Sequence, residues 1–380
     1  MQTILTNARL ILENEVVDGT IVFDESGIVA VDQGRSQLPA AIDAGGDYVA
    51  PGLVEMHTDN AEKHFVPRPR VYWPNGLAAI LAHDAQMAAA GVTTVYDAIC
   101  FGYSDGEKDY RRQISGRVLQ AVAHGMNLGA FRIDHKIHLR CELTGPFLIE
   151  DVLPHKDEPL IQLVSLMDHT PGQRQWRFVE QYRTYTLGAG NTLPEDFDAT
   201  MRQRMEVGPR YVAANCQAVI DTFKSRHLPI ATHDDTTVEH VAEGQSLGAV
   251  ICEFPTTVVA AAAAHARGMA TIAGAPNVVR GGSHSGGVSV SELAERDILD
   301  GLSSDYVPAS LLQAVLKLST QHGIALPKAM GMVTWKIADI LNLEDRGHLR
   351  PGLRGDIVRF RVLDDTPIVV SSWSGGCRAN

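Results

Sequence analysis

No part of this 380-residue sequence is apolar for long enough to cross a membrane. A membrane-spanning helix needs about 20 mostly apolar residues, whereas the longest run of small apolar residues, 258–264, is short and mostly alanine. Residues 1–12 also lack the basic region and the apolar stretch of a signal peptide. These absences predict a cytoplasmic protein that does not enter a membrane.

Closely spaced cysteine pairs are also absent. The five cysteines are far apart in the sequence and form no CxxC pair: Cys100, Cys141, Cys216, Cys252 and Cys377. A small secreted domain held by disulfides has an even number of cysteines at short spacings. The sequence therefore predicts reduced thiols, which agrees with a cytoplasmic location.

An excess of basic charge is missing as well, because the formal net charge is −12. Proteins that bind nucleic acid without strong specificity neutralise phosphates with clustered lysine and arginine. The charge balance thus predicts no nucleic-acid partner. It does not exclude an anionic small molecule, since screening over about 8 Å lets a local basic cluster act against the overall sign.

The sequence does contain a long alternating middle between two β-rich ends. Short strand-like runs separated by turn residues occupy the first fifty residues, and glycine and proline punctuate 347–362 before another such run. Strand-like apolar runs of the middle fall at 53–56, 92–98, 136–143, 161–167, 229–232, 249–254, 271–275 and 301–304. Helical patterns lie between several of them, at 76–90, 111–124, 210–226, 238–247, 257–267 and 310–322.

This alternation predicts an α/β protein with a (β/α)8 TIM-like barrel. A chain of this length exceeds the usual size of one hydrophobic core. We therefore predict a barrel over 51–344 and a small β-sandwich domain assembled from both termini, 1–50 plus 345–380. An open doubly wound sheet is the alternative, and it is disfavoured because no GxGxxG motif follows a first strand.

Polar residues stand where the predicted barrel strands end, which is where such barrels place their active sites. They are His57, Asp59, Glu142, Asp168, His169, His233, Asp234, Asp235 and Asp305. Each histidine alone is more often an ordinary hydrogen-bonded residue than a ligand. Imidazoles and carboxylates gathered at one edge of a barrel, however, form a set that suits a divalent metal.

The spacing of polar residues within two strands supports this hypothesis. His57 and Asp59 are two residues apart, so they point to the same side of a strand. The run 136–143 alternates strictly, with Lys136, His138, Arg140 and Glu142 on its polar face. We expect that face to line the inside of the barrel, and an edge strand facing water is the alternative.

The segment 49–57, the glycine- and proline-marked tail 347–356 and the split β domain resemble the amidohydrolase superfamily over nearly the whole chain. The resemblance implies an HxH pair, a carboxylated lysine, two later histidines and a final aspartate. This sequence departs from that pattern, since Asp59 replaces the second histidine and Glu142 stands in place of the lysine. Glutamate can bridge two metals without carboxylation.

Longer motifs at 57–64, 67–69, 134–142, 168–173 and 274–285 resemble one branch of the superfamily, the diphosphatases of the carbon–phosphorus lyase pathway. The resemblance implies hydrolysis of a phosphoanhydride bond of α-D-ribose 1-methylphosphonate 5-triphosphate. The products are pyrophosphate and the 5-phosphate. The implied partner is therefore a phosphorylated ribose.

The resemblance also implies roles for individual residues. One or two divalent ions, zinc first and manganese or iron as alternatives, are held by His57, Asp59, Glu142, His169 and His233. Asp305 orients the attacking water and takes its proton. A substrate of high negative charge needs matching donors, and we expect these to be Lys63, His64, Arg68, Arg140, Asn277, Arg280, Ser283 and His284.

Several alternatives stay open at this point. A hydrolase of C–N bonds, acting on a cyclic amide or as a deaminase, shares the metals and the fold but does not need the arginines. A non-catalytic scaffold subunit is a second alternative. Of Asp234 and Asp235, one is expected to orient His233 and the other to be solvated. The segment 173–205 is interpreted either as a lid over the site or as a contact between copies of the chain in a homo-oligomer.

Overall fold

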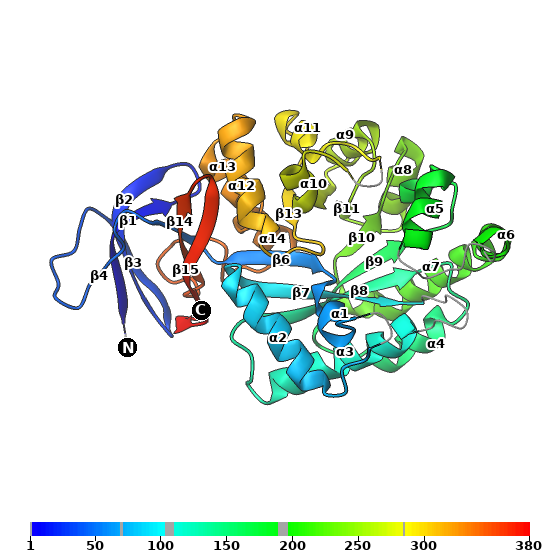
Figure 1. Ribbon diagram of the computed structural model, residues 1–380, viewed down its shortest axis with the longest axis horizontal. Coiled ribbons are helices and arrows are strands. Elements are labelled where there is room, and N and C mark those ends of the chain that lie inside the picture. The colour runs from blue at the N-terminus through cyan, green and yellow to red at the C-terminus, as the bar shows by residue number, and fades with distance from the viewer. Residues whose placement is uncertain (1, 69–70, 103–109, 189–196, 284–285) are drawn as a thin grey trace.

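The computed structural model describes residues 2–68, 71–102, 110–188, 197–283 and 286–380. Its strands form two eight-stranded sheets (Figure 1). No helix of the described residues is long and apolar enough to span a membrane.

One sheet is a barrel of parallel strands in the order in which they occur along the chain. Its strands are β6 (Leu53–Thr58), β7 (Val92–Phe101), β8 (Asp134–Glu142), β9 (Ile161–Met167), β10 (Ile230–His233), β11 (Ile251–Glu253), β12 (Ala270–Gly274) and β13 (Gly301–Ser303). A bridge between Thr58 and Asp305 joins the first strand to the last and closes the barrel. The predicted barrel is confirmed, and each predicted strand run overlaps one of these strands.

Helices surround this barrel and follow most of its strands. They are α1 (Asn60–Phe65), α2 (Gly76–Ala89), α3 (Tyr110–Asn127), α4 (Leu148–Val152), α5 (Val179–Gly188), α6 (Phe197–Val207), α7 (Pro209–Phe223), α8 (Val238–Ser246), α9 (Val258–Ala266), α10 (Ala275–Arg280), α11 (Val290–Glu295), α12 (Ser310–Gln321), α13 (Leu326–Gly331) and α14 (Trp335–Ile340). Local chemistry sets several of their starts, because the side chains of Asn75, Thr237 and Thr257 cap the first turns of α2, α8 and α9.

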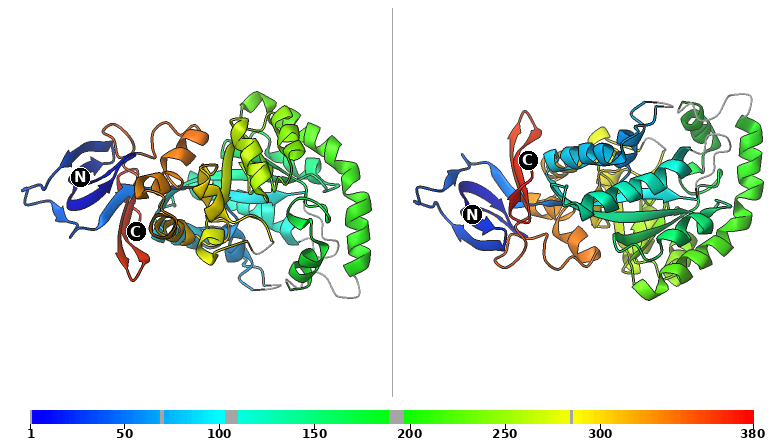
Figure 2. Two further views of the ribbon diagram at one scale, coloured as in Figure 1. Left: turned by 90° about the horizontal axis from the view of Figure 1, so that it is seen from above. Right: turned by 90° about the horizontal axis from the view of Figure 1, so that it is seen from below.

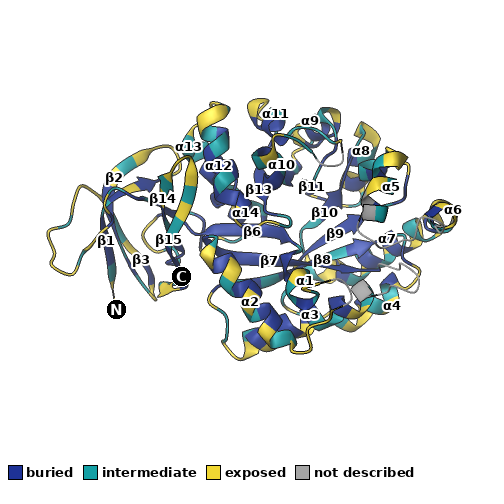
Figure 3. Ribbon diagram, viewed as in Figure 1, coloured by how far each residue is buried: buried dark blue, intermediate teal, exposed yellow. Residues whose placement is uncertain are grey.

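The lower part of the barrel lumen is filled by apolar side chains. Val54, Met56, Tyr96, Leu163 and Ile272 belong to one buried cluster inside the strands. Figure 3 shows the barrel strands as almost wholly buried. A ligand therefore has no room in the lower half of the lumen, and the polar strand ends are the remaining place for a site.

The second sheet comes from both ends of the chain. It contains β1 (Thr3–Ile11), β2 (Val16–Asp24), β3 (Gly27–Gln33), β4 (Ile42–Asp43), β5 (Tyr48–Pro51), β14 (Ile357–Leu363), β15 (Thr366–Ser374) and β16 (Cys377–Arg378). Their order is β16-β15-β14-β5-β1-β2-β3, and β4 pairs with β1. The rings of Phe23 on β2 and Trp373 on β15 are 5.3 Å apart although three strands separate β2 from β15. The sheet thus folds over onto itself, which confirms the predicted β-sandwich.

The small domain lies at one end of the barrel, as the further views show (Figure 2). Its last strands contact the amino-terminal ends of barrel strands, since Ser374 Oγ donates to the carbonyl oxygen of Thr93. Arg346 bonds both Thr94 on β7 and Asp134 on β8. The small domain consequently covers the end of the barrel opposite to the carboxyl ends of the strands.

Candidate metal centre and substrate cavity

A cavity of about 610 Å³ opens at the carboxyl ends of the barrel strands. Its lining includes most of the predicted metal ligands and the predicted base: His57, Asp59, His169, His233 and Asp305. Several predicted substrate-binding residues also line it, namely Lys63, Arg140, Asn277, Arg280 and Ser283. The barrel therefore brings together side chains from β6, β8, β10 and the segments after β9, β12 and β13.

One buried carboxylate orients two of these imidazoles. Glu253, at the end of β11, accepts from His57 Nδ1 at 2.7 Å and from His233 Nδ1 at 3.1 Å. The two imidazole rings lie 5.8 Å apart and nearly parallel. Because a carboxylate accepts only, Nδ1 carries the proton in both rings and Nε2 keeps its lone pair. Burial lowers the pKa of His57 well below its usual value and that of His233 to about 3, so both rings are neutral.

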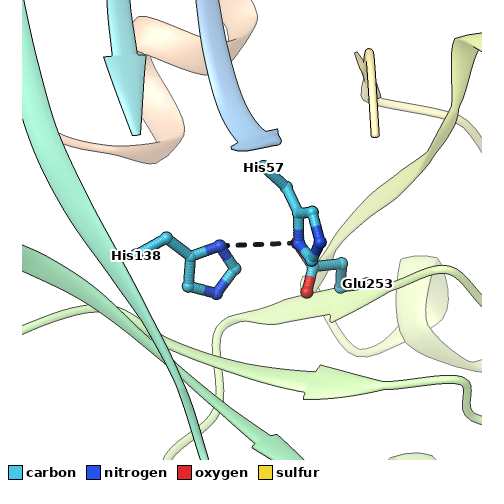
Figure 4. A group of neighbouring side chains, drawn as sticks. All are labelled: His57, His138 and Glu253. Carbon is cyan, nitrogen blue, oxygen red and sulfur yellow. Dashed lines mark hydrogen bonds and ion pairs between the residues drawn. The ribbon is translucent and has the colours of Figure 1, made fainter. Parts of the chain in front are cut away.

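His138 lies beside His57 and Glu253, inside the barrel (Figure 4). Its Nδ1 is 3.1 Å from the carbonyl oxygen of Met56, and its buried Nε2 has no hydrogen-bond partner. Burial lowers the pKa of His138 to about 3, so this ring is neutral as well. His57, His138 and Glu253 place ligand-type atoms within 4.8 Å of one another. The expected polar face of β8 does point into the lumen here.

A second group of ligand-type atoms consists of His169, His233 and Asp234. His169 Nδ1 is 2.5 Å from Glu142 Oε2, while its Nε2 is 3.4 Å from Asp234 Oδ2. Asp234 Oδ2 is buried and has no hydrogen-bond partner. Burial opposes charge on His169, but Glu142 and Asp234 outweigh it and raise its pKa to about 9. These two carboxylates therefore favour the protonated form of His169.

Glu142 was expected to bridge two metals, and its surroundings differ from that expectation. Its Oε1 accepts from Thr144 Oγ1 at 2.6 Å and from the backbone N–H of His169 at 3.3 Å, and its Oε2 faces His169 Nδ1. It is not among the residues that line the cavity. Both oxygens therefore hold His169 and its loop. The contact forms because Glu142 ends β8, while His169 follows the neighbouring strand β9.

Asp305 and Asp59 lie close together at the junction of the first and last barrel strands, where like charges repel. Burial raises the pKa of Asp305 to about 7, and the carboxylate of Asp59 adds to the effect. Asp59 Oδ1 is buried and lacks a hydrogen-bond partner. Asp305, Asp234 and Phe254 all have positive φ angles, between 53° and 57°. Such strained backbone is typical of functional sites, and here it occurs at three strand ends around one cavity.

Three cations line the cavity at different depths. Arg140 lies inside the barrel, and its Nε is 3.3 Å from the sulfur of Met167. Within the described part of the chain, neither Arg140 nor the exposed Arg280 forms an ion pair with a carboxylate. Lys63 donates to the carbonyl oxygen of Tyr306. Two guanidinium groups are thus available to an anion in the cavity.

The loop after α10 is fastened by Asn277. Its Nδ2 donates to the carbonyl oxygen of Val288, and its Oδ1 accepts from the backbone N–H of Val290, both at 3.0 Å. Asn277 therefore uses its amide on the chain itself, although it lines the cavity together with Ser283.

The segment after β9 provides one wall of the cavity through Gln175 and Trp176. Arg174 fastens it, because its guanidinium donates to the buried Asp235 at 2.5 Å and to the carbonyl oxygen of His233 at 3.1 Å. Asp235 also accepts from Thr232 Oγ1 at 2.5 Å. The expectation that one of the two aspartates after His233 is solvated is therefore wrong, since both are buried and Asp235 is paired.

Three predicted substrate-binding residues are not placed in the cavity. His64 Nε2 is 3.0 Å from Gln86 Oε1, so this ring turns toward α2. Arg68 is exposed and does not line the cavity. Residue His284 lies outside the described residues. His64 lies within the short helix α1, and Arg68 follows it.

Another buried cluster lies outside the barrel, between α2 and strands β7 and β8. Asp97 accepts from His83 Nε2 and from His135 Nδ1, both at 2.8 Å. His135 Nε2 reaches Asp84 at 3.4 Å, and Arg132 pairs with the other oxygen of Asp84 at 2.9 Å. Burial opposes the charge of His135, but Asp97 and Asp84 raise its pKa to about 9. Charges alternate in sign along this network, and its polar atoms are paired.

The chain is similar to a curated protein over nearly its whole length. No family model matches the chain. A curated relative, the alpha-D-ribose 1-methylphosphonate 5-triphosphate diphosphatase of Escherichia coli (strain K12), is 41% identical over 380 residues, 99% of each chain. This chain belongs to that diphosphatase family. The motif-based resemblance is thereby confirmed.

Solved structures agree on the fold of this diphosphatase family member. N-isopropylammelide isopropylaminohydrolase from Burkholderia multivorans covers 100% of this chain and 98% of its own with a TM-score of 0.65 at 14% identity. N-acetyl-D-glucosamine-6-phosphate deacetylase from Mycobacterium smegmatis covers 99% of both chains with a TM-score of 0.63 at 16% identity. At such identities the likeness concerns the fold alone, and it confirms the amidohydrolase-type barrel.

The sequence interpretation missed Glu253 and His138 as parts of the site. Glu253 is the penultimate residue of the predicted strand run 249–254, as Glu142 is of the run 136–143, so the same strand-end rule that selected Glu142 pointed to it. His138 was assigned to the polar face of its strand but not to the ligand set. Both omissions concern residues whose importance depends on a contact with His57, from a strand far away in the sequence.

Proposed function

We propose that the protein is a metal-dependent hydrolase that cleaves α-D-ribose 1-methylphosphonate 5-triphosphate at the phosphorus nearest the ribose. Pyrophosphate leaves, and the 5-phosphate remains, as a step of phosphonate utilisation. The observation that carries this proposal is the 41% identity, over 99% of both chains, to a relative named for that diphosphatase activity. The cavity supports it, because ligand-type residues and unpaired guanidinium groups line the same space.

We assign one or two divalent ions to His57, Asp59, His169, His233 and Asp234, with zinc as the first choice and manganese or iron as alternatives. The residues fit such an ion. Two neutral imidazoles present Nε2, and two buried carboxylate oxygens, Asp59 Oδ1 and Asp234 Oδ2, have no hydrogen-bond partner. A buried oxygen without a partner is costly, and a metal ion removes that cost.

Glu142 and Glu253 take a supporting role in this assignment. Each holds the Nδ1 side of an imidazole and thereby fixes which nitrogen faces the ion. Carboxylates in this position raise the basicity of a ligating imidazole. The earlier expectation of Glu142 as a bridging ligand is therefore replaced by Glu142 as the residue that orients His169.

Asp305 is proposed as the group that takes a proton from the attacking water. A divalent metal, when bound, lowers the pKa of water and neutralises phosphate charge. Asp305 lies at the junction of the first and last strands, and its pKa of about 7 suits proton transfer near neutral pH. Its side chain lines the same cavity as His57 and His233.

Arg140, Arg280 and Lys63 are proposed to neutralise the substrate's phosphates. A buried anion is stable only when opposite charge and hydrogen bonds match it. The planar fork of arginine binds two phosphate oxygens at once. Trp176 and Phe254 line the apolar part of the cavity and exclude water from the anions.

The division of labour within the chain is part of the same proposal. Residues 51–344 form the catalytic unit, and residues 1–50 with 345–380 support its closed end. We also propose a cytoplasmic location, which agrees with five cysteines that form no disulfide.

The test is a pyrophosphate-release assay on the purified protein after loading with zinc, manganese or iron in turn, with elemental analysis of each sample. We expect one pyrophosphate per ribose 1-methylphosphonate 5-triphosphate consumed. Parallel reactions use a cyclic amide and an amine substrate. Turnover of only the amide or amine, or a protein that holds no transition metal and hydrolyses nothing, would contradict the proposal.

A matched pair of variants tests the anion-binding part. Arg140→Met removes an unpaired guanidinium inside the barrel, and we expect KM for the triphosphate to rise about tenfold or more. As a control, Arg132→Met removes a half-exposed guanidinium that pairs with Asp84 in the buried cluster outside the barrel. Equal KM values in both variants would remove Arg140 from the substrate site.

A further inference from the structure

The junction between β6 and β13 differs from the other strand junctions of the barrel. Its lower half contains no direct ladder, because residues 332 and 333 lie between the two strands. The backbone N–H of Val54 donates to Val333 at 2.9 Å, and that of Leu302 donates to Met332 at 2.8 Å. The strands that carry Asp59 and Asp305 therefore meet only above this insertion.

Glu55 fills the junction just above the insertion. Its side chain is fully buried, with an exposed fraction of 0%. Oε1 accepts from the backbone N–H of His57 at 2.7 Å, and Oε2 accepts from the backbone N–H of Ser304 at 2.6 Å. One carboxyl group thus supplies, across the junction, the acceptors that a neighbouring strand normally provides.

Two hydroxyl groups complete the contact at the same height. Ser303 Oγ donates to the carbonyl oxygen of His57 at 2.6 Å and accepts from the backbone N–H of Asp305 at 3.1 Å. Thr58 Oγ1 donates to the carbonyl oxygen of Asp305 at 2.8 Å. Asp305 itself has a φ of 53°, a conformation that needs outside support in a residue with a side chain.

We propose that Glu55 is a positioning residue that sets the separation between Asp59 and Asp305 by tying the backbone of His57 to that of Ser304. His57 lies two residues before Asp59, and Ser304 directly precedes Asp305. Small displacements of reacting groups lower the rate strongly, because the groups must be in place before the reaction. The catalytic part of this inference rests on the function proposed above.

Glu55→Gln is the test variant because it keeps the shape and removes one acceptor. The amide NH2 that replaces one oxygen faces a backbone N–H, so one strand must move away. We expect kcat for pyrophosphate release to fall at least thirtyfold, with KM changed less than threefold. The dissociation constant for zinc, measured by competition with a chromophoric chelator, is expected to rise about tenfold. Amide exchange at His57 and Ser304 is expected to become at least tenfold faster.

Asp84→Asn is the matched control. Asp84 is also fully buried and also accepts two backbone N–H groups, from Arg132 at 2.9 Å and Ile133 at 3.2 Å. It lies on the outer side of the barrel. We expect this variant to lose thermal stability as Glu55→Gln does, while its kcat and its zinc affinity stay within twofold of the wild type.

Ser303→Ala is the second test variant in case Glu55→Gln does not fold. It removes the hydroxyl that joins His57 to Asp305, and we expect kcat to fall about tenfold with KM unchanged. Wild-type kcat, zinc affinity and amide exchange in both test variants, or an equal loss of kcat in Asp84→Asn, would overturn the proposal. The exchange and zinc measurements do not use the substrate, so they remain decisive even if the wild type releases no pyrophosphate.

Discussion

This barrel has two buried clusters of histidine and carboxylate, one inside the barrel at the strand ends and one on the outer side of the strands. The outer cluster, His83, Asp97, His135 and Asp84, pairs its polar atoms with one another and with Arg132. The inner cluster leaves His138 Nε2, Asp59 Oδ1 and Asp234 Oδ2 buried without a hydrogen-bond partner. Both have metal-type residues.

The difference shows which property marks a site. A network in which each donor meets an acceptor and the charges alternate is stable without a ligand. A cluster that keeps lone pairs and carboxylate oxygens unused inside a cavity can bind a ligand without first breaking an internal hydrogen bond. Residue type alone does not separate the two clusters, whereas the remaining hydrogen-bonding capacity does.

The largest expected effect is a loss of kcat, which only a change in the inner cluster should cause. Asp305→Asn removes the proposed proton acceptor, and we expect kcat to fall about 10³-fold. Metal content, measured by elemental analysis, should stay near that of the wild type because Asp305 is not assigned to the ligand set. Activity equal to the wild type would exclude Asp305 from the catalytic role.

Removing the centre of the outer network should reduce stability and leave metal binding intact. Asp97→Asn leaves the imidazolium of His135 without its nearest counter-charge, and the cost of such a change is about 3–5 kcal/mol of unfolding free energy. Urea unfolding followed by circular dichroism measures it. A loss of bound zinc in this variant would mean that the outer cluster also holds metal.

The stability of the outer network should also depend on pH. The pKa of His135 is raised to about 9 in the folded protein from an unfolded value near 6.5. Its stabilisation is therefore complete below pH 6.5 and is lost as pH rises to 9. The size is about 3 kcal/mol at most.

Urea unfolding of wild type and His135→Gln between pH 6 and pH 9.5 isolates this contribution. We expect the difference between the two proteins to shrink steadily as pH rises. A constant difference over this range would show that His135 is neutral in the folded state.

The smallest expected effect sharpens the description of the inner cluster. Glu253→Gln keeps one acceptor for two imidazoles, so His57 or His233 loses its fixed tautomer. Changes of this kind reduce metal affinity about 10–100-fold. Zinc competition measures it, and Glu239→Gln, a surface carboxylate on α8, serves as the control. An unchanged zinc affinity in Glu253→Gln would contradict the orienting role.

Much of the architecture was predictable because it depends on local pattern. The apolar runs and the helix ends along the middle of the chain indicated the barrel, and the strict alternation around His138 and Arg140 indicated which face of β8 is internal. His57 and Asp59 followed from the strand-end rule. These features need only the chain's own periodicity and the geometry of a strand.

Contacts between distant strands were not predictable in the same way. The placement of Glu142 against His169, of Glu253 between two imidazoles and of Arg174 on Asp235 depends on which strand ends meet after closure. His64 and Arg68 do not line the cavity, because the direction of a short helix after a strand end is set by packing. No periodicity in the sequence records that direction.

The sequence by itself determined the barrel, the small domain from both termini and the set of strand-end residues that make up the candidate metal site. The tertiary structure alone decided which of those residues orient an imidazole and which keep an oxygen free for a ligand. It determined which carboxylate oxygens are used by imidazoles or backbone amides and which remain free. The physical reason is that hydrogen-bonding capacity is assigned only when the strands are side by side, and the closure at Glu55 fixes that arrangement.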